Sequence, residues 1–225
     1  MSQSFSLTDS LSLADLQVYL SRAGRVEDGA VRLISAAGVL AVYTAILYPR
    51  GLLDSSPTVL GLRTFALTEP VELDAVVPVR SLLDRVARLT GAVVDPGAPV
   101  AVTVPLEVST VTWAGISPPR GGWQSQGEAD AALLENAARA GIDEVAASIP
   151  TGTGEQIVQR VRSEVWGRPV EGLEFVPSGA AFAAYSLGFL APDEPVALFE
   201  TGPWTRLSTS RGHILVRRKP WTLKA

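Results

Sequence analysis

The sequence predicts an α+β fold, with an antiparallel or mixed sheet built from N- and C-terminal hairpins and helices packed mainly on one face. Three observations predict it. Strand-like runs occur near both ends of the chain, helical runs lie between them, and regular β–α alternation with a GxGxxG motif is missing. The chain has 225 residues, 47% of them hydrophobic, which is enough to bury a core and excludes a mainly disordered protein.

The N-terminal third predicts one helix and three strands. Residues 1–8 are polar and Ser-rich, and we expect them to be loose. Ser12 is placed to cap a helix over residues 12–22. Residues 31–36 and 39–48 are rich in β-branched residues and predict a hairpin that turns at Ala37-Gly38, and residues 58–67 predict a third strand. A buried helix over residues 33–49 stays open as an alternative.

The rest of the chain predicts helices followed by a C-terminal hairpin. Pro78 precedes a helix over residues 79–89, residues 91–99 and 116–126 have loop composition, and residues 100–105 and 107–113 alternate like an interrupted strand. The Ala-rich run 128–149 is helical with a break at Gly141, and further helices are expected over 154–166 and, capped by Ser178, over 179–189. Residues 196–200 and 206–218 predict strands that turn at Arg211-Gly212.

We expect one domain over residues 1–225, with a subdivision open near the 91–99 loop and a basic tail over 219–225. The formal net charge is −4, but residues after Glu200 carry +6 and the preceding residues −10. Such asymmetry can mark a nucleic-acid-binding arm. The alternative is that an acidic body neutralises its own basic C-terminal strand, and the sequence favours this second interpretation.

The composition predicts a bacterial protein of the cytoplasm that does not enter a membrane. The uncharged stretches 33–49 and 175–192 are shorter than the ~20 residues that a spanning helix needs. A signal-peptide n-region is missing, because residues 1–15 contain no Lys or Arg.

The chain has few groups for catalysis. Cys is absent, so disulfides, thiolate catalysis and Cys-based metal sites are excluded, and we expect no metal and no cofactor. His213 is the only histidine and would have to be the base of any Ser-His-Asp triad, with Ser117, Ser178 or Ser208 as the nucleophile. None of these serines lies in a GxSxG motif. The sequence therefore favours a protein that is not an enzyme.

Residues 150–156 (PTGTGEQ) allow two interpretations. Glycines at a helix start can direct backbone N–H groups toward a phosphate, which would involve Thr151, Gly152, Thr153 and Gly154. The lysine and the spacing of a P-loop are missing, however. Thr153 followed three residues later by Gln156 also matches a capping box, which needs no ligand, and this interpretation is favoured.

Tryptophan and arginine lie together in two Pro/Gly-rich segments. Residues 113–123 form a segment that begins and ends with tryptophan and contains Arg120, and residues 202–206 precede Arg211 and His213. Indole faces and guanidinium groups suit stacking and anion contacts, although the same pairs can be structural. The candidate partner-binding residues are Trp113, Arg120, Trp123, Trp204, Arg206, Arg211 and His213.

Three functions therefore compete. The leading hypothesis is a non-catalytic binding module that contacts an unknown protein partner or a small anionic ligand through the Trp/Arg segments, with a homo-oligomer also open. The second is an enzyme or sensor that binds a phosphorylated small molecule at residues 151–156. The third is weak nucleic-acid binding through the basic C-terminal strand, which the acidic body disfavours.

Overall fold

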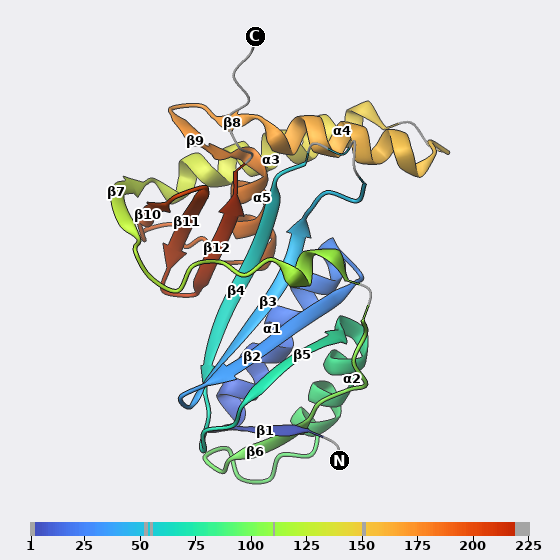
Figure 1. The fold of residues 1–225 in the computed structure, drawn as a ribbon, viewed down its shortest axis with the longest axis vertical. Helices are drawn as coiled ribbons and strands as arrows, with labels where there is room; N and C mark the ends of the chain where they lie inside the picture. Colours follow the sequence, from blue (N-terminus) through green and yellow to red (C-terminus); the bar gives the residue numbers. More distant parts are fainter. Residues whose placement is uncertain (1–2, 52–53, 55, 110, 150–151, 219–225) are drawn as a thin grey trace. The chain divides into compact units, whose positions relative to one another are not determined.

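The computed structural model describes residues 3–51, 54, 56–109, 111–149 and 152–218. These residues group into two compact units. The first comprises Met1–Ala45 and Leu62–Ile116, and the second comprises Ile46–Gly61 and Ser117–Ala225. Helices and antiparallel strands occur in both, so the predicted α+β class is confirmed (Figure 1). The single domain over residues 1–225 stays a prediction, and the 91–99 loop lies wholly within the first unit.

The first unit contains a sheet with the strand order β5-β2-β3-β4 and a separate pair, β1-β6. Strands β3 and β4 contribute residues to both units. In chain order the elements are β1 (Ser4–Leu7), α1 (Ser10–Val26), β2 (Ala30–Ala36), β3 (Val39–Leu47), β4 (Thr58–Ala66), β5 (Leu73–Pro78), α2 (Val79–Thr90), β6 (Val100–Thr103) and a 3₁₀ helix (Thr112–Gly115).

The predicted hairpin over residues 31–48 is confirmed. Strands β2 and β3 pair antiparallel from Val31↔Thr44 to Ala36↔Val39. Ala37 (φ 51°) and Gly38 (φ 78°) form the turn, whose left-handed backbone matches the twist of the two strands. Every second residue of β2 is buried, which is the pattern of a strand with one face on the core. The alternative of a helix buried on every side is therefore wrong.

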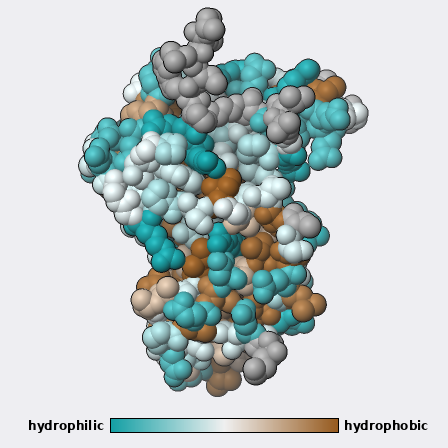
Figure 2. Space-filling model, viewed as in Figure 1, coloured by the Kyte–Doolittle hydropathy of each residue, from teal (hydrophilic) through white to brown (hydrophobic). Residues whose placement is uncertain are grey.

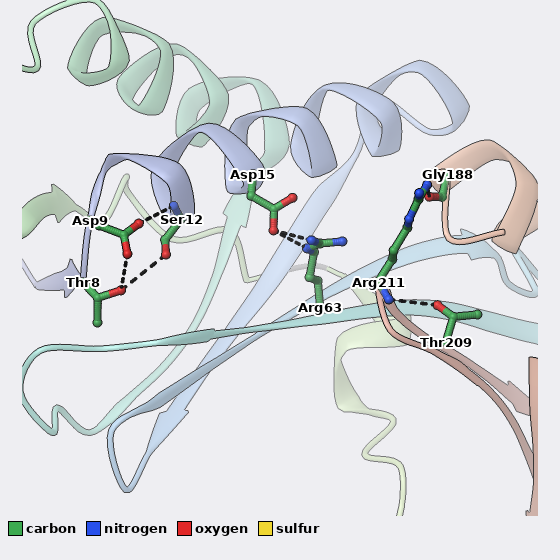
Figure 3. Close-up of polar contacts among 8 residues, drawn as sticks. All are labelled: Thr8, Asp9, Ser12, Asp15, Arg63, Gly188, Thr209 and Arg211. Atoms are coloured by element: carbon green, nitrogen blue, oxygen red, sulfur yellow. Dashed lines mark hydrogen bonds and ion pairs between the residues drawn. The ribbon is translucent and has the colours of Figure 1, made fainter. Parts of the chain in front are cut away.

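Helices α1 and α2 pack against each other and cover one face of the first unit's sheet (Figure 1). Helix α1 is longer than predicted, and Ser12 is not its cap. Asp9 is the N-cap, and its carboxylate accepts a hydrogen bond of 2.7 Å from the backbone N–H of Ser12 (Figure 3). Arg63 of β4 donates to Asp15 of α1 over 2.7 Å.

The opposite face of this sheet is rich in apolar side chains. The alternating positions that point away from the helices are half-buried, and Figure 2 shows hydrophobic residues gathered over this part of the molecule. The apolar members of this set include Ile34, Ala41, Tyr43, Leu62 and Val76. One ion pair interrupts them, because Arg32 donates to Asp74 over 2.8 Å.

Two expectations for this unit are wrong. Residues 4–7 are not loose: they form β1, which pairs with β6 and buries Phe5 and Leu7 completely. Residues 107–109 and 111–113 are not in a strand either. Val108 donates one backbone hydrogen bond to Val76, and the chain then turns into the 3₁₀ helix, which directs the ring of Trp113 inward.

The second unit contains the strand order β4-β12-β11-β10-β7 and a small pair, β8-β9. Helices α3 and α5 pack together, and α4 packs on both. In chain order the elements are β7 (Gln124–Ala129), α3 (Ala131–Ser148), α4 (Glu155–Gly167), β8 (Pro169–Val170), β9 (Leu173–Pro177), α5 (Ser178–Leu187), β10 (Val196–Thr201), β11 (Trp204–Thr209) and β12 (Gly212–Arg217). The predicted C-terminal hairpin is therefore confirmed, but its turn is Ser210-Arg211 and not Arg211-Gly212, because Gly212 already pairs with Thr209.

Helix α3 runs through Gly141 without the predicted break. The ring of Trp166 lies directly over this glycine, and an added Cβ would be 2.3 Å from Cζ3 of Trp166. The same ring stacks on Phe182 of α5, with 4.3 Å between the ring centroids. Gly141 is thus present because the backbone of α3 approaches an indole, and the helix continues because glycine can adopt helical dihedrals.

Two predicted helix caps are also wrong. Helix α5 has Pro177 as its N-cap, and the Ser178 hydroxyl instead donates a 2.6 Å hydrogen bond to the carbonyl of Val165. Helix α4 has Gly154 and not Thr153 as its N-cap, and glycine has no side chain with which to cap. Among the described residues, no helix has the length and apolar character that crossing a membrane requires.

Candidate functional site

The candidate site lies on the sheet of the second unit, on the face turned away from α3 and α5. Along β11, Leu207 is buried on the helix side, and Arg206 and Ser208 occupy the other face. The strand register places Phe199 of β10 opposite Arg206, and His213 of β12 opposite Ser208. We define the Arg206 cluster as the residues on this face together with Trp123, that is Trp123, Phe199, Arg206, Ser208 and His213.

Arg206 is held between two aromatic rings. Its Cζ lies 4.6 Å from the ring centroid of Trp123 and 4.4 Å from that of Phe199. Trp123 directly precedes β7, and its indole N–H donates to the carbonyl of Pro119 over 3.2 Å, which fixes the ring. Two rings on one guanidinium limit its rotation and leave its edge as the direction from which an anion can approach.

Arg206 has no ion-pair partner among the residues that the structure describes. Its Nε is shielded from solvent and makes no hydrogen bond. Burial lowers the pKa of the Arg206 guanidinium, although arginine stays charged at every physiological pH. The cluster therefore presents a fixed cation that lacks a carboxylate.

His213 and Ser208 form the second part of the cluster. Nδ1 of His213 lies 2.9 Å from Oγ of Ser208. Burial, and secondly the positive charge of Arg206, lower the pKa of His213. The geometry thus unites the histidine with one of the three serines considered for a triad. The charged neighbour is a guanidinium, however, which opposes the imidazolium that a triad aspartate would stabilise.

The other candidate residues are distributed differently. Arg120 is exposed in the segment before β7. The exposed Arg211 donates to the carbonyl of Gly188 over 3.4 Å, and its own backbone N–H donates to Thr209 (Figure 3). Trp204 does not lie in a loop: it is buried at the start of β11. Trp113 is buried in the first unit, whereas the other six candidates belong to the second.

The structure brings the two predicted segments together at one contact, that of Trp123 with Arg206. Phe199 and Ser208 were missed as binding residues. Only the strand register could have identified them, because it places Phe199 of β10 opposite Arg206 and His213 of β12 opposite Ser208. Register depends on exact turn lengths and could not be fixed from the pattern alone.

The phosphate-binding interpretation of residues 151–154 stays a prediction. Thr151 lies outside the described residues. Gly152 has a φ of 85°, and the first turn of α4 contains Glu155, which pairs with Arg50 over 3.5 Å. A carboxylate in the first turn already interacts favourably with the helix dipole that a phosphate would use. In the described part of the chain, no group of three or more His, Asp or Glu residues could hold a metal ion.

Two family models match the chain, and each is described as a domain of unknown function. One (DUF8010) matches residues 1–105, and the other (DUF8185) matches residues 118–221. Each therefore covers less than half of the chain. No curated protein matches.

Solved structures with a similar fold are DNA polymerase sliding clamps. Two structures from Caulobacter crescentus, titled as pol III beta and as the DNA polymerase sliding clamp, each give a TM-score of 0.53 at 12% and 14% identity. A putative DNA polymerase III beta subunit from Eubacterium rectale gives 0.51 at 9% identity. The matches cover 98% of this chain and 67%, 67% and 66% of those chains, so this chain spans about two thirds of their length. At this identity the likeness shows the fold alone.

Proposed function

We propose that the chain is a non-catalytic protein-interaction module and that the Arg206 cluster is its binding surface. The observation that carries the proposal is the Arg206 guanidinium, fixed between Trp123 and Phe199 and without a carboxylate partner in the described chain. Arginine and tryptophan are the residue types that most often dominate binding energy at protein interfaces. A pre-positioned arginine also loses little side-chain entropy when a partner binds.

The fold supports a role in an assembly. The neighbour from Eubacterium rectale is named as a subunit of DNA polymerase III, and a subunit works through contacts with other proteins. The partner of this chain is then a protein that brings a carboxylate to Arg206. This proposal places the chain in the cytoplasm. A small anionic ligand at the same cation is the alternative.

The chemistry of the cluster also favours binding over catalysis. A general base needs a pKa near the working pH, and burial together with Arg206 moves the pKa of His213 below its ordinary value. Arg206 is therefore suited to holding an anion, and its charge opposes the formation of an imidazolium at His213. Ser208 then has the role of a hydrogen-bond partner that orients the imidazole ring.

Affinity capture with matched variants tests the proposal. The wild-type chain, Arg206→Gln, Trp123→Ala and the control Arg160→Gln, which changes an exposed arginine of α4, are used as baits under the same conditions. We expect one protein to be retained by wild type and by Arg160→Gln and lost with both cluster variants. That protein is then purified, and its Kd is measured for the four chains. We expect a loss of about tenfold or more for Arg206→Gln.

Thermal unfolding of the same variants separates binding from packing. We expect Tm to change by only a few degrees, because the cluster is half-buried on an open sheet face. A collapse of Tm in both cluster variants would show that the rings and Arg206 are part of the core. Equal retention of every protein by all four baits would also reject the cluster as the binding surface.

A further inference from the structure

The outer edge of β7 is a second surface that the cluster does not use. Strand β7 ends the strand order of the second unit, with β10 on one side and no strand on the other among the described residues (Figure 1). Five of its six residues are exposed. An edge of this kind leaves backbone N–H and C=O groups open for pairing with another strand.

The two ends of this edge carry opposite charges. Arg120 is exposed shortly before Gln124, and the hydrogen bond from Trp123 to Pro119 closes this segment at the first end of β7. At the other end lies an open cavity of about 410 Å³. Its lining includes four carboxylates, those of Glu128, Asp130, Asp193 and Glu194.

Two of these carboxylates accept hydrogen bonds from the chain itself. Asp130 accepts a 2.8 Å hydrogen bond from the backbone N–H of Ala132 as the N-cap of α3. Glu194 accepts from both the backbone N–H and the hydroxyl of Ser210, and these hydrogen bonds lower the pKa of Glu194. The acidic end therefore gathers carboxylates that favour a cation from outside the chain.

We propose that β7 pairs antiparallel with β7 of a second copy of this chain. An isologous interface requires one surface to complement itself under a two-fold rotation. Antiparallel pairing of two β7 strands does this, because the Arg120 end of each copy then faces the acidic end of the other. A second copy therefore satisfies both charged ends at once, without any assumption about the composition of an unknown partner.

The bulge in β7 sets the strength of this dimer. The register with β10 shifts between Ala197 and Phe199, and Gly127 has a φ of 91° at this point. A bulge interrupts the backbone ladder, and a six-residue edge is short, so the dimer is weak. Because the sheet continues through the two-fold axis, the dimer presents two Arg206 clusters on the same face.

Charge-swapped variants test the pairing directly. Arg120→Glu places an acidic residue at both ends of the edge, and Glu128→Lys adds a basic residue to the acidic end, so that each end then carries one. We expect each variant alone to dimerise at least about tenfold more weakly than wild type. A mixture of the two variants is expected to recover a heterodimer, because each altered end then meets its complement. Sedimentation velocity over a range of concentrations, at low and at high salt, measures all three samples.

Several outcomes would overturn this inference. The inference is wrong if the wild-type chain remains monomeric up to millimolar concentration. It is also wrong if the charge swaps leave the dimer unchanged. Failure of the mixture to associate more strongly than either variant also rejects antiparallel pairing. Arg160→Gln is the control for loss of one arginine. The capture experiment with Arg206→Gln is independent of these results, so the proposed function can fail or survive separately.

Discussion

Trp166 occupies space that a side chain would take at two helices of the second unit, through its indole at one and its backbone at the other. It covers Gly141 of α3, and an added Cβ at Gly179 of α5 would lie 2.9 Å from the backbone oxygen of Trp166. Glycine costs helix stability at an interior position, so its presence in α3 is compensated by this close packing. The packing, and not a need for a helix end, therefore determines which residue stands at position 141.

This packing predicts the effect of Gly141→Ala. A Cβ at this position would lie 2.3 and 2.7 Å from two atoms of a ring that is stacked on Phe182 and has little room to move. We expect the variant to lose roughly 1–3 kcal/mol of unfolding free energy, despite the higher helix propensity of alanine. Urea unfolding followed by tryptophan fluorescence measures the loss.

Gly24→Ala is the matched control in α1. Its Cβ would lie 3.8 Å from Val79, which is an ordinary contact. Helix propensity then acts alone, and we expect a gain of about 0.5–1 kcal/mol. Equal effects of the two substitutions would show that the Trp166 ring does not restrict position 141.

His213 provides a titration probe of the Arg206 cluster. Burial, and then the charge of Arg206, lower the pKa of His213 in the folded chain. The unfolded chain therefore binds this proton more readily, so folding stability decreases as pH falls below about 6.5 toward the folded-state pKa. Arg206→Gln removes the charge and leaves the burial, and we expect the pKa of His213 to rise toward its ordinary value. Because the chain has one histidine, a single NMR resonance reports it.

An unchanged His213 titration in Arg206→Gln would mean that the two side chains are not close in solution. Arg160→Gln serves again as the control, because α4 contributes nothing to the cluster. The titration therefore tests the geometry of the cluster without needing a partner.

At the scale of elements, β1 is part of the core of the first unit. Leu7 is fully buried, and Leu11, four positions later in α1, is 79% exposed. We expect Leu7→Ala to cost about 2–5 kcal/mol of unfolding free energy, and Leu11→Ala less than about 0.5 kcal/mol. Chemical denaturation of both variants checks the difference. A tolerated Leu7→Ala would mean that β1 detaches from β6 in solution.

The elements that could be predicted are those with local signals. The β2–β3 hairpin follows from β-branched residues around Ala37-Gly38, and α2 from apolar spacing after Pro78. Strand β1 was missed because its four residues gain their stability from pairing with β6, nearly a hundred positions later. The stop at Gly141 was wrongly expected because its reason, the ring of Trp166, lies in another helix.

The candidate site was predictable in part for the same reason. Trp123 and Arg206 have residue types that suit binding, and this could be read from composition. That they contact each other depends on β7, β10 and β11 being neighbours. Trp113 and Trp204 lie in segments of the same Pro/Gly-rich composition, but both are buried. A 3₁₀ helix directs the ring of Trp113 inward, and the start of β11 does the same for Trp204.

At the scale of the whole molecule, two of the arginines after Glu200 are engaged by polar groups of the chain itself. Arg218 pairs with Glu200 over 2.7 Å, and Arg211 donates to the carbonyl of Gly188. This distribution supports self-neutralisation of an acidic body over a nucleic-acid-binding arm. The resemblance to DNA polymerase sliding clamps concerns the fold, so affinity for DNA has to be measured.

We expect no specific or salt-dependent binding to duplex DNA at moderate salt. A protein that neutralises several phosphates loses about 10³-fold or more in affinity between roughly 50 and 200 mM salt. The net charge of −4 opposes such contacts, and Arg218 is already paired with Glu200. Fluorescence anisotropy with a labelled duplex of about 30 base pairs measures this, since any residual binding should show a slope near zero against log salt. A steep negative slope that disappears after removal of residues 219–225 would instead assign DNA contact to the C-terminal tail and contradict self-neutralisation.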